Sequence, residues 1–125
     1  MNLGLFSRDR SKPTLSRRES LEAIPVLNRG VRSEQGTDNK LLLHVEVRRG
    51  TGFLARFQPP VMEKIIELDE LGSFVFHLID GKRDVLEIVD TFEKKYRVNR
   101  REAELSATLF LRSLTQRGVI SLVVK

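Results

Sequence analysis

The sequence predicts an α+β fold in which a three-stranded antiparallel sheet comes first, followed by three helices and a short terminal strand. Within residues 31–68 apolar and polar side chains alternate, which is typical of strands with one buried face. From residue 69 the apolar spacing becomes i, i+3, i+4 and i+7, which is typical of helices with one buried stripe. A length of 125 residues with 40% apolar residues suits one domain with its own core.

The three strands differ in how clearly the pattern marks them. Residues 41–48 alternate strictly and form the clearest strand. A shorter strand is expected at Val31–Glu34, joined to it by the turn-forming residues Gln35–Asn39, so the two should make a hairpin. A third strand at Met62–Leu68 carries apolar residues on both faces, which indicates that each face touches an apolar neighbour.

Capping residues mark where the three helices begin. Asp69, Asp84 and Asn99 are expected N-caps, and Gly81 and Gly118 are expected to end the first and third helices. The helices are therefore predicted at 69–81, 84–96 and 99–117, with the terminal strand at 119–124.

The chain is expected to divide into an arm and a domain. Residues 1–24 are rich in Ser and Arg and predict a basic, mostly flexible arm. One short helix is expected in this arm, because Ser16 and Glu19 form a capping box and Pro25 stops the turn. Residues 25–125 are expected to form the domain, with residues 48–60 as an inserted apolar loop.

Composition argues against several classes of function. The chain has no cysteine, which excludes disulfides, thiolate metal sites and cysteine nucleophiles. His44 and His77 have no second histidine at ligand spacing, and no catalytic constellation of side chains stands out, so we expect no metal, no cofactor and no enzymatic activity. No apolar stretch approaches the ~20 residues of a membrane span, and a cytoplasmic location without membrane contact is expected.

The predicted third helix is apolar on two sides. Ala103, Ala107 and Leu114 share one stripe, whereas Leu105 and Leu109 project from nearly the opposite side. One interpretation is that the second face packs against the chain's own sheet. The other is that it forms one wall of a groove whose second wall is the third strand.

The segment from residue 68 to residue 88 resembles the PqqD-like family. The family pattern has a Leu-Asn pair, a helix ending in Asp-Gly, and a Thr-x-x-Glu-Ile helix start. The matching residues here are Leu68, Asp69, Asp80, Gly81, Asp84, Glu87 and Ile88, and Phe110, Leu111, Leu114, Gly118, Val119 and Ile120 are similar to the closing helix and strand. Asp69 and Asp84 differ from the family residues but still cap helices. The resemblance covers residues 25–124, whereas the arm and the 48–60 loop are additions to the family core.

The resemblance implies a winged helix-turn-helix-like arrangement and a peptide-recognition function. Proteins of this family bind the leader segment of a precursor peptide as a strand added to the sheet edge. They present it to a modifying enzyme, often a radical S-adenosylmethionine enzyme, in the maturation of ribosomally made peptides or of pyrroloquinoline quinone.

The predicted peptide-binding residues lie on the third strand and the third helix. Main-chain hydrogen bonds would hold the peptide, apolar side chains would select it, and Arg112 would form an ion pair with an acidic side chain of the peptide. The expected set is Val61, Lys64, Ile65, Ile66, Glu67, Leu105, Thr108, Leu109, Arg112 and Gln116. The inserted loop adds Phe53, Leu54 and Phe57, which either fold back onto the sheet or contact a partner.

Two further classes of function stay open. A winged helix could bind DNA through Arg97, Arg100 and Arg101. However, residues 69–125 carry ten Lys or Arg against nine Asp or Glu, so nucleic acid is not the expected partner. The third class is a structural subunit that forms a homodimer through strand edges or the apolar loop.

Overall fold

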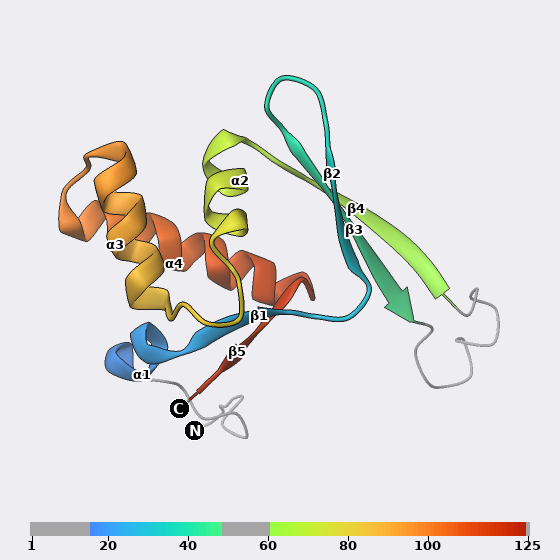
Figure 1. The fold of residues 1–125 in the computed structure, drawn as a ribbon. Helices are drawn as coiled ribbons and strands as arrows, with labels where there is room; N and C mark the ends of the chain where they lie inside the picture. Colours follow the sequence, from blue (N-terminus) through green and yellow to red (C-terminus); the bar gives the residue numbers. More distant parts are fainter. Residues whose placement is uncertain (1–15, 49–60, 125) are drawn as a thin grey trace, which may run out of the picture.

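A computed structural model describes residues 16–48 and 61–124 of the chain. It confirms the predicted α+β class, and its helices lie on one side of a three-stranded sheet (Figure 1). The elements are α1 (Arg17–Glu22), β1 (Ile24–Leu27), β2 (Val31–Gln35), β3 (Leu41–Arg48), β4 (Val61–Leu68), α2 (Glu70–His77), α3 (Val85–Tyr96), α4 (Arg100–Gln116) and β5 (Ile120–Val123).

The larger sheet has the order β2-β3-β4, and both of its strand pairs are antiparallel. The β2–β3 turn contains Asp38 and Asn39 with positive φ, a conformation that Asp and Asn tolerate better than most residues. Register places Leu43 opposite both Ser33 and Ile66. The inward face of β3 and β4 is buried through Leu41, Leu43, Val45, Ile66 and Leu68, which pack toward the helices.

The helices begin at the caps that the sequence predicts. The side chains of Asp69, Asp84 and Asn99 accept hydrogen bonds from the backbone N–H groups at the third helical positions. α2, the first of the three predicted helices, ends earlier than predicted, at His77, where the backbone N–H groups of Leu78 and Ile79 bond to carbonyls only three residues back. Asp80 Oδ1 then accepts from the backbone N–H groups of Lys82 and Arg83 and closes a turn.

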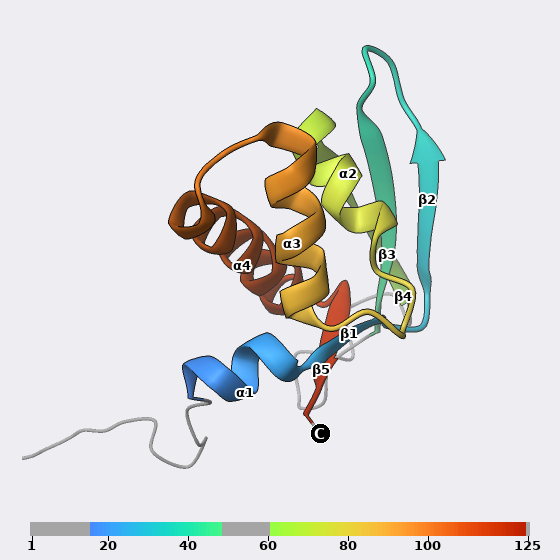
Figure 2. The same cartoon turned by 60° about the vertical axis from the view of Figure 1, so that its left-hand side comes forward.

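A second, two-stranded sheet joins the two ends of the described chain. β1 pairs antiparallel with β5, with Leu27 opposite Ile120. In both views this pair crosses beneath the helices (Figures 1 and 2). The sequence indicated β5 but not β1, and Pro25, which was expected to end the short helix, is itself the second residue of β1.

The described part of the predicted arm, residues 16–24, packs against the folded body. α1 has the predicted capping box between Ser16 and Glu19. Ala23, which follows α1, is fully buried, and its carbonyl accepts a hydrogen bond from the backbone N–H of Val85. Arg17 donates two hydrogen bonds to Glu104 on α4. α1 therefore forms one side of the helical layer.

Among the described residues, no helix is both long enough and apolar enough to span a membrane.

Candidate functional site

β4 has an open edge, because among the described residues it pairs with β3 alone. The backbone N–H of Glu46 donates to Gly30 O and that of Gly36 to Lys40 O, so the even-numbered residues of β3 bond to β2. Antiparallel alternation then directs the odd-numbered residues of β3 toward β4, where their partners are residues 62, 64, 66 and 68. Residues 63, 65 and 67 therefore turn their N–H and C=O groups to the open edge.

The side chains of β4 alternate between the helix side and the outer face of the sheet. Ile66 is 5% exposed and belongs to the core, so its predicted place in the site is corrected: its side chain is buried and its backbone faces β3. Ile65 is 58% exposed and lies on the outer face, away from α4. The wall that β4 presents toward α4 is therefore formed by Met62 and Lys64, whereas the side chain of Val61 lies outside the described residues.

The outward side of α4 carries the two leucines that the sequence singled out. Leu105 is 57% exposed and Leu109 is 50% exposed, although both are large apolar side chains. The interpretation that this face packs against the chain's own sheet is therefore wrong.

Between β4 and α4 lies an open cavity of about 350 Å³. Its lining residues are Lys40, Glu67, Leu68, Asp69, Phe110, Ser113 and Arg117. At the same flank of α4, Lys64 Nζ donates to the carbonyl of Arg117 at 3.3 Å. Phe110, Ser113 and Arg117 were not among the predicted site residues, although their spacing of i, i+3 and i+7 places them on one flank of the helix.

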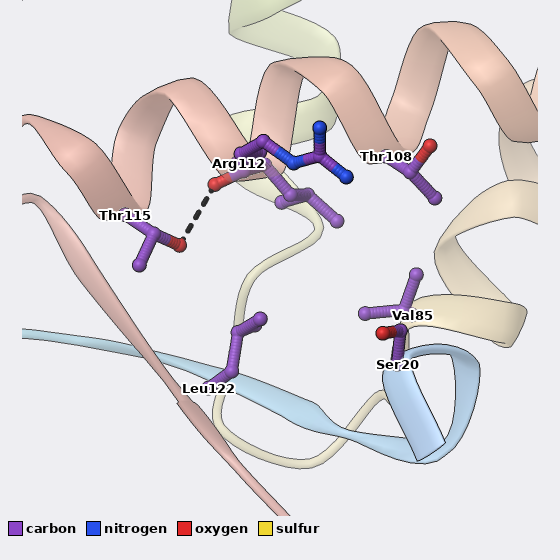
Figure 3. A pocket seen from close by; sticks show the side chains of 7 residues that line it. Ser20, Val85, Thr108, Arg112, Thr115 and Leu122 are labelled. Carbon is purple, nitrogen blue, oxygen red and sulfur yellow. Dashed lines mark hydrogen bonds between the residues drawn. The ribbon is translucent and has the colours of Figure 1, made fainter. Parts of the chain in front are cut away.

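Thr108 and Arg112 lie on the other flank of α4. They line a cavity of about 250 Å³ whose remaining walls come from α1, α3 and β5 (Figure 3). The predicted site residues of α4 are thus divided: Leu109 stands between the flanks, Thr108 and Arg112 face α1, and Gln116 is exposed near the end of the helix. Arg112 therefore does not share a cavity with Lys64 or Glu67.

Charged side chains cover much of the outer face of the sheet. His44 Nε2 lies 2.8 Å from Glu34 Oε1, and His44 Nδ1 lies 3.2 Å from Glu63 Oε1. Hydrogen bonds to Glu34 and Glu63 raise the pKa of His44. Glu63 also forms an ion pair with Arg32, and Lys40 Nζ lies 3.8 Å from Glu67 Oε1.

The arginines that would contact DNA are partly engaged. Arg100 forms ion pairs with Asp90 and Glu93, which raise the pKa of its guanidinium. Arg97 occupies the left-handed C-cap of α3 and Arg101 is exposed. Of these three arginines, Arg100 is therefore held by carboxylates of α3.

Two other expectations concern sites away from the β4 edge. The described residues contain no group of three or more His, Asp or Glu side chains that could hold a metal ion. Phe53, Leu54 and Phe57 of the inserted loop lie outside the described residues.

Comparisons with known proteins agree with this fold. A structure described as TbiB1 in complex with the TbiA(beta) leader peptide matches with a TM-score of 0.57 and 23% sequence identity, over 77% of this chain and 94% of that chain. No curated protein is similar enough in sequence to count as a match. The family model for PqqD, described as coenzyme PQQ synthesis protein D, matches residues 40–120, and the chain therefore belongs to the PqqD family.

Proposed function

We propose that this protein binds a precursor peptide as a strand added to β4 and presents it to an enzyme that modifies the peptide. The proposal assigns the protein no catalytic step of its own. The observation that carries it is the pairing of an open backbone edge on β4 with an uncovered apolar face on α4. An extended peptide bonded to residues 63, 65 and 67 would satisfy that edge and cover Leu109 at the same time.

The β4 edge suits this role better than the other open edge of the sheet. β2 also pairs with β3 alone among the described residues, so its outer edge is open as well. Beside β4, however, Lys64 reaches α4 and a cavity opens toward Phe110. A peptide on β4 would therefore gain side-chain contacts with a helix in addition to backbone bonds. TbiB1, which shares the fold, has a leader peptide as its bound partner.

The side chains around β4 define the chemistry of the peptide. On the outer face, Ile65 favours an apolar peptide residue opposite it, and Glu67 favours a basic one. On the helix side, Leu109 favours an apolar peptide residue near the Leu68 end of the strand, and Met62 favours another near its beginning. Lys64 and Arg117 take the role that was expected of Arg112, because they lie where an acidic peptide residue could reach them.

The enzyme that receives the peptide is assigned here only by class. A peptide-modifying enzyme of the cytoplasm, such as a radical S-adenosylmethionine enzyme, fits a chain without cysteine.

The test is one substitution made on each open edge of the same sheet. Ile65→Pro removes an N–H that faces the open edge of β4, and Ser33→Pro removes an N–H that faces the open edge of β2, so neither breaks a bond to β3. We expect Ile65→Pro to weaken the binding of precursor peptides encoded near this protein's gene by about tenfold or more. The substitution removes one backbone hydrogen bond to the peptide and disturbs the bonds on either side of it. Ser33→Pro should leave the affinity unchanged. Isothermal titration calorimetry measures both.

Circular dichroism of the two variants must show an intact fold. Equal affinities for Ile65→Pro and wild type would rule out strand addition at β4. A loss confined to Ser33→Pro would move the peptide to β2.

A further inference from the structure

We propose that the groove between α1 and α4 docks the modifying enzyme, through an acidic segment of that enzyme that carries one apolar side chain. We call this surface the α1–α4 groove and define it by Arg17, Ser20, Arg101, Leu105, Thr108 and Arg112. The identity of the partner rests on the proposed function, whereas the surface itself lies on the flank of α4 away from β4.

The floor of the groove is apolar and the rim is polar. The cavity of about 250 Å³ has Val85 and Leu111 at its base, both buried, with Leu122 partly buried beside them. Ser20 on α1 and Thr108 on α4 both line it, with the side chain of Val85 drawn between them (Figure 3). This volume and lining suit one apolar side chain from a partner.

The groove continues along α4 toward its N-terminal end. A neighbouring cavity of about 340 Å³ is lined by Arg17, Arg101, Glu104, Leu105 and Thr108. Thr108 lines both cavities, which makes them one surface. Leu105 supplies a second exposed apolar contact, and so the groove is long enough for a segment rather than a single side chain.

The charge of the groove is positive. Glu104 is neutralised by Arg17, whose guanidinium donates to both of its carboxylate oxygens at 2.8 and 2.7 Å and lowers the pKa of Glu104. Arg101 and Arg112 have no ion pair within residues 16–48 and 61–124. A partner segment with acidic residues would complement these two cations.

The chemistry favours a protein over a nucleic acid. Leu105 and the apolar floor would lie against phosphates if DNA occupied the groove, and Arg17 is already paired. The precursor peptide is also a poor occupant, because a strand on β4 lies on the opposite flank of α4. Peptide and enzyme could therefore bind at the same time.

The experiment compares matched charge reversals on the purified full-length chain. Arg101→Glu with Arg112→Glu changes the groove, and Arg29→Glu with Lys94→Glu makes the same change of charge at exposed positions elsewhere. The probes are the purified peptide-modifying enzymes encoded beside this protein's gene, measured by biolayer interferometry. We expect the groove variant to lower affinity for one of these enzymes about tenfold. Its affinity for the precursor peptide should remain within about twofold of wild type, and the control variant should bind both normally.

A second variant tests the apolar floor. Ser20→Phe fills the cavity without changing charge and should weaken the same enzyme complex, again with the peptide unaffected.

Several results would overturn the inference. The wild-type protein could fail to bind any of the enzymes. The groove variant and the control variant could lose equal affinity for the enzyme. The groove variant could also lose affinity for the precursor peptide while it still binds the enzyme normally. Binding of a duplex DNA that the groove variant abolishes would assign the surface to nucleic acid. None of these outcomes changes the Ile65→Pro result, which tests the peptide site independently.

Discussion

His44 lies on the outer face of the sheet between two carboxylates, and this makes the stability of the fold sensitive to pH. Glu34 and then Glu63 raise the pKa of His44, while nearby Arg32 opposes the shift. Because the folded pKa lies above the ordinary value of about 6.5, the protonated imidazole stabilises the folded state fully below that pH. The contribution is lost as the pH rises through the raised pKa.

We therefore predict that wild type loses more stability than His44→Gln between pH 6 and pH 9. Urea unfolding at several pH values measures the difference, and NMR titration of the imidazole reports the raised pKa directly. Glu34→Gln removes the larger cause and should reduce the pKa. Identical pH profiles for wild type and His44→Gln would contradict the assignment.

At the residue scale, the sequence predicts which side chains are exposed more readily than which element of the fold lies beside each of them. Helical and strand periodicity identified Leu105, Leu109 and Ile65 as surplus to one core, and all three are exposed. Periodicity could not tell which neighbour lies beside each flank of α4. Arg112 was therefore expected near the peptide, although α1 and β5 turn its flank into a separate surface.

At the scale of elements, α2 and α4 approach each other closely at Gly72. A Cβ at this position would lie 3.0 Å from Phe110 Cε1 and 3.3 Å from Asp69 Oδ1. Phe110 also lines the cavity beside β4, so the packing of these helices and the shape of that cavity are linked.

We predict that Gly72→Val destabilises the protein by about 1–3 kcal/mol, because the added side chain must displace Phe110. The matched substitution Leu71→Val, at the exposed neighbouring position, should cost less than about 1 kcal/mol. Thermal unfolding of both variants checks the difference. Similar stabilities would show that Phe110 moves aside at little cost.

Local signals explain which elements could be predicted. Three N-caps and the hairpin turn depend on a few neighbouring residues, and their positions agree with the structure. β1 has four residues and includes Pro25, and its partner β5 is almost the whole chain away. No local pattern could reveal that pairing, because it exists only when the helices bring the two strands together.

At the scale of the molecule, one core unites the sheet and the helices. Leu43, on the central strand, is fully buried, whereas Leu42 points to the outer face and is half-buried. We predict that Leu43→Ala lowers the free energy of unfolding by about 2–5 kcal/mol and that Leu42→Ala lowers it by less than half as much. Chemical denaturation followed by circular dichroism measures both. Equal losses would mean that the outer face of the sheet is covered in solution.

The charge pattern of β4 also bears on how the molecule behaves at high concentration. If two copies joined antiparallel along β4 with Ile65 at the centre, Glu63 of each would lie opposite Glu67 of the other. Centring the pair on Lys64 would instead bring two ammonium groups together. Arg32 and Lys40 lie beside the two carboxylates and offset part of their repulsion, so the register centred on Lys64 carries the stronger penalty, and like charges oppose the adhesion of two copies along this edge.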